Sequence, residues 1–265
     1  MQSELVESYA RFCRYRKTAK ESGCLDLSDI GFVYPTTLLP TISLLSHNKK
    51  FNPPKDKSVA RYIETASNGK ANGTVCPIVE LPDEPEKYGQ IIQNLYSIHL
   101  NDGRNCGGAN AFKYSVGELT DNIYQHSKFC HAFVMGQSYP RMGFTEICIL
   151  DDGKSIPGAF SEHGMAFNCD SDAVVEAIRG ASTKNKEEGR GMGLGSTLNL
   201  IVHGLNGEVF IASRNGAIFL GVGKKQIYTL PDEMRFDGTL ASFRIPYTKE
   251  PIEQYLQYVE KHIEI

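Results

Sequence analysis

The sequence predicts an α/β protein: a two-layer α/β sandwich, in which helices cover one face of a mixed, largely antiparallel sheet, with a small α/β region before it. The order of elements in residues 101–265 is the first reason, because it runs helix, two strands, long polar loop, helix and three strands. Composition is the second, since 41% hydrophobic and 22% charged residues are ordinary for a globular protein.

The N-terminal region mixes helical and strand-like segments. Its expected elements are a helix over residues 1–20, a strand-like piece over 31–33, a buried helix over 36–45, a helix over 59–67, a strand over 75–81 and an amphipathic stretch over 88–100. A polar, glycine-bearing run over 101–108 is the best candidate boundary. We therefore expect two units, residues 1–100 and residues 101–265.

The helix expected over residues 111–126 carries a carboxylate and an amide on one side. Apolar residues recur in it at spacings of four, three and four, which predicts a core-facing stripe of Phe112, Val116, Leu119 and Ile123. Glu118 and Asn122 lie four residues apart, so their side chains are neighbours at about 5–6 Å. A positioned carboxylate can accept a proton from water, and an amide oxygen can bind Mg²⁺. Taken alone, the same residues suit a solvated helix face.

An acidic turn ends the strand expected over residues 145–150. Asp151 follows the strand directly, and we expect Gly153 to adopt a backbone conformation closed to other residues. A carboxylate at a strand end can accept a hydrogen bond from the exocyclic amine of adenine. A strand followed by aspartate and glycine is also usual for a plain turn.

A glycine-rich string follows a long polar segment, residues 157–188, which includes a short helix expected at 173–179. Glycine at every second position lets backbone N–H groups approach phosphate oxygens, and the string comprises Gly189, Arg190, Gly191, Met192, Gly193, Leu194 and Gly195. The apolar run that follows predicts a helix, whose N-terminal dipole favours anions. Lys184 and Lys186 in this segment are candidates to bind phosphate, with Lys184 preferred, although lysines in such a loop are more often solvated. The spacing matches neither a P-loop nor a dinucleotide-binding fingerprint.

Three further strands are expected over residues 207–212, 217–221 and 239–245, with turns between them. Thr239, preceded by Gly238, begins the last of these strands. A short helix is expected over 252–262.

Four motifs thus follow one another: ELTDN at 118–122, DDGKSI at 151–156, GRGMGLG at 189–195 and GTLASF at 238–243. In this order they resemble the GHKL ATPases, the superfamily of gyrase, heat-shock chaperone ATPases, histidine kinases and mismatch-repair ATPases. The resemblance implies the Bergerat fold and ATP with Mg²⁺ as cofactors. It makes Glu118 the base that polarises water and Asn122 the metal ligand. Asp151 would bind adenine with support from Thr239, and residues 157–188 would form the ATP lid.

One position departs from the family pattern. Ser155 stands where the acidic box has its second glycine, which puts the close approach of the backbone to the base in doubt. A weaker resemblance covers residues 25–45, which are similar to the strand-then-helix core of STAS domains. It implies an α/β shape for this region and no phospho-switch, because Pro35 falls near the position of the family's phosphorylated serine.

Among GHKL proteins, the layout is closest to a stand-alone ATPase domain of the anti-sigma-factor serine kinase type. Only about twenty residues follow the last motif, too few for a transducer domain, and no coiled coil precedes Glu118. We expect a slow ATPase or a protein serine/threonine kinase. The alternative is a non-catalytic, nucleotide-gated interaction module. The sequence leaves open which of the two it is.

Composition and cysteine spacing limit the partners. A net charge of −3 gives no support for nucleic-acid binding. The seven cysteines are dispersed and never form CxxC, which argues against a disulfide framework or zinc cluster and favours a reducing cytoplasm. No apolar run is long enough for a membrane span, and the first twenty residues lack the apolar core of a signal peptide. We expect a regulatory protein partner and leave a homodimer open.

Overall fold

A seven-stranded sheet forms the centre of the computed structural model, which describes residues 3–44, 50–68, 73–98, 106–181, 193–248 and 251–265. Its strand order is β3-β4-β5-β9-β6-β7-β8, and each neighbouring pair is antiparallel. The strands are β3 (Val75–Glu80), β4 (Ala132–Tyr139), β5 (Phe144–Asp151), β6 (Glu208–Arg214), β7 (Gly216–Gly221), β8 (Lys224–Thr229) and β9 (Phe236–Pro246). The predicted α/β class with a largely antiparallel sheet is confirmed.

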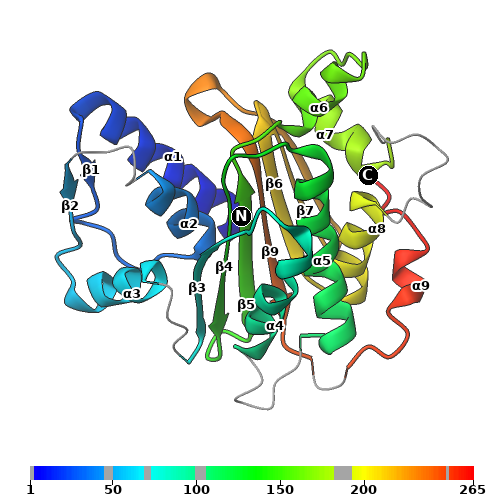
Figure 1. Ribbon diagram of the computed structural model, residues 1–265, viewed down its shortest axis with the longest axis horizontal. Coiled ribbons are helices and arrows are strands. Elements are labelled where there is room, and N and C mark those ends of the chain that lie inside the picture. Colours follow the sequence, from blue (N-terminus) through cyan, green and yellow to red (C-terminus); the bar gives the residue numbers. More distant parts are fainter. Residues whose placement is uncertain (1–2, 45–49, 69–72, 99–105, 182–192, 249–250) are drawn as a thin grey trace.

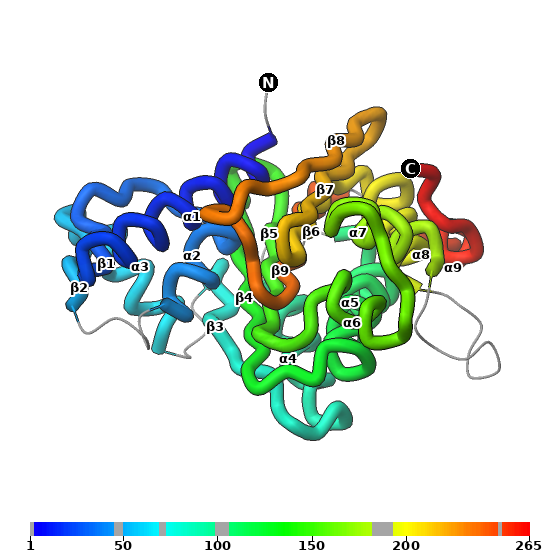
Figure 2. Tube along the Cα trace, turned by 90° about the horizontal axis from the view of Figure 1, so that it is seen from above, coloured from blue at the N-terminus to red at the C-terminus, as the bar shows by residue number. Residues whose placement is uncertain are grey.

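Helices cover both faces of this sheet (Figures 1 and 2). The helices after residue 106 share one face, as the predicted sandwich requires: α5 (Ala109–His126), α6 (Ile156–Glu162), α7 (Asp170–Ile178) and α8 (Leu194–Asn199). α4 (Gly89–Ser97) packs beside α5 on that face. The opposite face is covered by α1 (Glu4–Ser22), α2 (Pro35–Ser43) and α3 (Lys57–Ser67), which form an additional layer.

The alternation of side chains along each strand assigns residues to the two faces. On β5, Ile147 and Ile149 point toward α5 and α8, whereas Cys148 and Leu150 point toward the N-terminal helices. Both sets are buried, so a strand in this sheet contributes to two separate cores.

The first hundred residues share the central sheet with the rest of the chain. β3 precedes the expected boundary at residue 101, yet it pairs with β4, which follows that boundary. The strand expected over residues 31–33 is absent, and that prediction was wrong. A short strand lies earlier in the chain instead: β1 (Leu25–Asp26), which pairs in parallel with β2 (Phe51–Asn52). Within the described part of the chain no strand pairs with residues 31–33, and Phe32 is 57% exposed.

A buried ion pair within the sheet also binds the start of α2, which belongs to the N-terminal layer. Glu146 on β5 is fully buried and accepts a hydrogen bond from Arg244 Nε on β9 at 2.7 Å. Its other oxygen accepts from the backbone N–H (2.9 Å) and hydroxyl (2.6 Å) of Thr36 at the start of α2. Thr36 and Thr37 are fully buried.

The structure contains elements that the sequence did not predict and a helix that is shorter than predicted. β8 and α6 were missed, because β8 is an exposed edge strand of sequence KKQIYT and α6 is a seven-residue helix. The helix expected over residues 252–262 is limited to α9 (Leu256–Val259). A π-helical turn, Leu200–Gly204, extends α8. In the portion of the chain that the structure describes, none of the helices combines the length and apolar character needed to cross a bilayer.

Candidate functional site

A row of three polar residues crosses the end of the sheet. Asp151, the last residue of β5, lies opposite Thr239 on β9, and Thr239 lies opposite Ser213 on β6. Side chains of paired residues share a face, so all three lie on the face that carries Ile149 and is covered by α5. The structure thus brings together two predicted site residues from separate motifs.

The carboxyl group of Asp151 is buried, with 2% of the residue exposed. Oδ1 accepts a hydrogen bond from the backbone N–H of Gly153 at 2.9 Å. Burial raises the pKa of Asp151 to about 7, an effect that the Gly153 hydrogen bond opposes and the Asp152 charge reinforces. A buried carboxyl that titrates near neutrality marks a candidate functional group.

The neighbouring carboxylate has a different role. Asp152 is exposed, and Oδ1 accepts hydrogen bonds from the backbone N–H groups of Cys130 (2.9 Å) and His131 (2.7 Å). It therefore ties the end of β5 to the loop that leads into β4. Of the two adjacent aspartates, Asp151 alone points into the row described above.

Two glycines allow close backbone contacts around Asp151. A Cβ atom on Gly153 would lie 2.3 Å from the carbonyl oxygen of Ser127, and one on Gly238 would lie 1.8 Å from the carbonyl oxygen of Asp151. The prediction that Gly153 adopts a backbone conformation closed to other residues was wrong, because its φ is not positive. Glycine is required here because the chain after α5 approaches too closely to leave room for a side chain.

The C-terminal end of α5 therefore abuts the acidic turn. Asn122 lies one turn before the last residue of this helix and Glu118 lies two turns before it. The side-chain nitrogen Nδ2 of Asn122 is buried and has no hydrogen-bond partner among the described residues. A buried donor without an acceptor is costly, which makes Asn122 a candidate ligand-binding residue.

The charge of Glu118 acts on two tyrosines, Tyr114 on α5 and Tyr88, which precedes α4. Burial, and after it the negative charge of Glu118, raises the pKa of Tyr114, one turn earlier on α5. Burial, followed by the hydrogen bond that the Tyr88 hydroxyl donates to Asp121 at 2.5 Å, raises the pKa of Tyr88, and the charge of Glu118 adds to this effect. Glu118 is thus a partly buried carboxylate on the helix face next to Asn122.

The glycine-rich string is described only from Gly193 onward. Gly193 caps α8, and a Cβ atom there would meet nothing within 4 Å. At Gly195 a Cβ atom would lie 2.0 Å from the Ile178 carbonyl oxygen and 2.7 Å from Nδ1 of His262, so the chain itself fills this space. Leu194 packs against the core. The remaining predicted residues of this part lie outside the described residues: Lys184, Gly189, Arg190, Gly191 and Met192.

Ser155 has a structural task that explains its departure from glycine. It is the N-cap of α6, and its hydroxyl accepts a hydrogen bond from the backbone N–H of Gly158 at 3.1 Å. The acidic turn therefore leads directly into a helix.

The hydroxyl of Ser213 makes three hydrogen bonds at this edge and was not singled out from the sequence. It accepts from the backbone N–H of Ile156 at 2.9 Å and donates to the carbonyl oxygen of Gly238 at 3.1 Å. Its third contact is Thr239 Oγ1 at 3.0 Å. A serine near the end of a strand gives no sequence signal of such a role.

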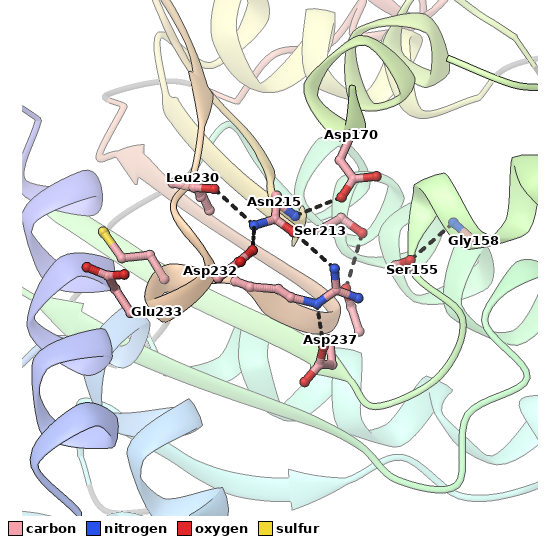
Figure 3. A network of polar contacts seen from close by, with 12 residues as sticks. Ser155, Gly158, Asp170, Ser213, Asn215, Leu230, Asp232, Glu233 and Asp237 are labelled. Atoms are coloured by element: carbon pink, nitrogen blue, oxygen red, sulfur yellow. Dashed lines mark hydrogen bonds and ion pairs between the residues drawn. The ribbon is translucent and has the colours of Figure 1, made fainter. Parts of the chain in front are cut away.

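Asn215, two residues after Ser213, contacts the start of α7 and the loop before β9, as Figure 3 shows. Its backbone N–H donates to Asp170 at the start of α7 (3.0 Å), and its Nδ2 donates to Asp232 (2.9 Å). Its Oδ1 accepts from Nη1 of Arg235 at 3.0 Å. The β6–β7 turn, the start of α7 and the loop before β9 are therefore held together at the end of β6.

Magnesium does not require a cluster of protein carboxylates. The described residues contain no group of three or more His, Cys, Asp or Glu side chains suited to a metal ion. Mg²⁺ usually keeps several waters and binds through one or two protein oxygens plus substrate phosphates. A single amide oxygen, as in Asn122, fits that mode.

No family model and no curated protein matches this chain. Among solved structures, the histidine kinase domain of the blue-light activated histidine kinase from Erythrobacter litoralis EL346 is similar to it, at 15% identity over 98% of this chain and 95% of that chain, with a TM-score of 0.25. A TM-score this low carries no argument, so the interpretation of the site depends on its own residues.

Proposed function

We propose that the protein binds ATP with magnesium at the edge formed by Asp151 and Thr239, and that it acts as a GHKL-type ATPase or protein serine/threonine kinase of the anti-sigma-factor type. One observation carries the proposal: the buried carboxyl of Asp151 lies in register with Thr239, on the sheet face that α5 covers. Two sequence motifs that are far apart along the chain thus meet at one edge.

Asp151 is proposed to recognise the base. As a carboxylate it accepts hydrogen bonds only, and the exocyclic amine of adenine donates them. Because the group is withdrawn from water, a bond to it is stronger than the same bond at an exposed position. Gly153 and Gly238 keep the surrounding backbone close to it.

Asn122 is the proposed magnesium ligand and Glu118 the proposed general base. Magnesium, when bound with ATP, supplies positive charge that offsets the charge of the phosphates. The string from Gly189 to Gly195 and Lys184 are proposed phosphate-binding residues on sequence grounds. Glu118 would accept the proton of the attacking water or hydroxyl group.

A nucleotide-gated interaction module is the second candidate. The capping role of Ser155 favours it, because a turn committed to starting α6 departs from the family's open glycine turn. In this case ATP occupancy would be reported to a regulatory protein partner in the cytoplasm with little turnover. Phosphate release separates the two candidates.

Titration calorimetry with ATP and ADP, with and without Mg²⁺, tests the proposal. Asp151→Asn is expected to weaken both nucleotides by a similar factor, because both contain adenine. The matched control is Asp172→Asn, an exposed aspartate on α7. Unchanged ATP affinity in Asp151→Asn would reject the assignment of the base site.

A further inference from the structure

The hydroxyl of Ser213 has one proton and three partners. The backbone N–H of Ile156 can only donate, so Ser213 accepts this bond (2.9 Å). The carbonyl oxygen of Gly238 can only accept, so Ser213 donates that bond (3.1 Å). The third partner is Thr239 Oγ1 at 3.0 Å, and because both groups are hydroxyls, either one can be the donor.

The local backbone indicates that the Ser213 proton is used in the hydrogen bond to the Gly238 carbonyl oxygen. The β6–β9 register shifts between Ser213 and Arg214, which pair with Thr239 and Phe236, so Asp237 and Gly238 have no register partner on β6. Gly238 is buried, and a buried carbonyl without a hydrogen bond is costly. The Ser213 proton is therefore committed to Gly238, and Thr239 must be the donor in the Ser213–Thr239 bond.

This assignment fixes what Thr239 can offer to a ligand. A threonine hydroxyl also has one proton, and here it points to Ser213, so the remaining lone pairs of Oγ1 can only accept. Thr239 is partly exposed, whereas Ser213 is fully buried. Above its pKa of about 7, Asp151, which lies directly opposite Thr239, is ionised and is likewise an acceptor only. The edge therefore presents two acceptors and no side-chain hydroxyl donor from this pair.

We propose that Ser213 is a specificity-determining residue, which holds Thr239 as an acceptor so that the edge prefers purines with an amine at position 6 over purines with a keto oxygen there. Ser213 acts through Thr239 and does not itself touch the base. This inference rests on the proposed function, because it assumes that the base lies against Asp151 and Thr239.

The test compares the affinities of ATP and inosine triphosphate, whose base carries a keto oxygen at position 6. The wild-type protein is expected to prefer ATP. In Ser213→Ala the Thr239 hydroxyl is free to turn its proton toward the keto oxygen, so inosine triphosphate is expected to bind roughly five- to tenfold more tightly than to wild type, with ATP little changed. General damage to the fold would weaken both nucleotides and would not raise either affinity.

Ser242→Ala is the matched control. Like Ser213, Ser242 is fully buried, but it lies on β9 and contacts Thr36 on the opposite face of the sheet. Its ratio of the two affinities should equal that of wild type. If Ser213→Ala does not fold, Ser213→Cys replaces the hydroxyl by a weaker donor, and the ratio should fall in the same direction. In a Thr239→Val background, the Ser213 substitution should leave the ratio unchanged, because the residue through which Ser213 acts is gone.

An unchanged ratio in a folded Ser213 variant, with ATP still dependent on Asp151, would overturn this inference and leave the proposed function standing. A wild-type protein that binds neither nucleotide would overturn both.

Discussion

Asp151 and Thr239 lie directly opposite each other on β5 and β9, with Gly238 packed so closely that a Cβ atom there would lie 1.8 Å from the Asp151 carbonyl oxygen. The pair is built from the last residue of one strand and an interior residue of another. The buried carboxyl, the hydroxyl and the absent side chain are thus parts of one arrangement, and changes to any of them should affect the same edge.

The protonation of Asp151 predicts how stability depends on pH. Its folded-state pKa of about 7 lies above the value of about 4 expected in the unfolded chain. The folded state therefore binds the proton more tightly, and this group's contribution to stability falls as pH rises from about 4 to about 7. Asp151→Asn should remove that slope and stabilise the protein at pH 8, by at most about 4 kcal/mol. Urea denaturation between pH 4 and pH 8 measures it, and an identical slope in both proteins would contradict it.

Asn122 is expected to carry the magnesium-dependent part of ATP affinity. Asn122→Ala removes the amide oxygen, so ATP binding in Mg²⁺ should fall toward the affinity measured in EDTA, while the EDTA value itself changes little. Calorimetry in the two conditions checks this. Asn110→Ala is the control, because Asn110 is an exposed residue of the same helix. Equal losses with and without Mg²⁺ would show that Asn122 serves another purpose.

Glu118 is expected to be needed for turnover and dispensable for binding. Glu118→Gln should retain ATP affinity and lose phosphate release or transfer by roughly 10²–10⁴-fold, the usual effect of removing a general base. Wild-type turnover itself should be slow. The exposed Glu86 provides a control variant, Glu86→Gln. Hydrolysis that is fast and insensitive to Glu118 would mean that another group accepts the proton; negligible wild-type turnover would favour the interaction module.

Gly238 should not tolerate a methyl group. Gly238→Ala places an atom against the Asp151 backbone, and overpacking of this kind costs roughly 1–3 kcal/mol of unfolding free energy. Gly31→Ala is the matched control, since a Cβ atom there would meet nothing within 4 Å. Chemical denaturation compares the two. A Gly238 variant as stable as the Gly31 variant would show that the strand end adjusts freely.

Glu146 is expected to hold the N-terminal layer on the sheet. Glu146→Gln leaves Arg244 buried without its counter-charge, and breaking such a pair typically costs about 3–5 kcal/mol. The exposed pair Glu84–Lys87 offers the contrast, because Glu84→Gln should cost less than about 1 kcal/mol. Limited proteolysis of residues 1–67 would report whether the layer detaches. Equal stability losses in the two variants would count against this role.

The sequence by itself determined the α/β class and most elements after residue 106. Periodicity is a local property, so the apolar stripe of α5 and the alternation along β5 could be recognised without knowing their neighbours. Asp151 and Thr239 could likewise be chosen as candidate site residues from the sequence, because their motifs are short and continuous. Local patterns failed at residues 31–33 and at β8, where pairing with another strand, or its absence, determines the conformation.

Only the tertiary structure decided which residues meet. The alignment of Asp151, Thr239 and Ser213 depends on the registers of three strands, and a shift of one residue would turn each side chain to the other face. The burial that raises the Asp151 pKa, and the close contacts that require glycine at 153 and 238, likewise come from segments distant in sequence. Glu146 and Arg244 show the same limit: they are ordinary charged residues in the sequence, and it is the β5–β9 register that pairs them and the start of α2 that packs against them.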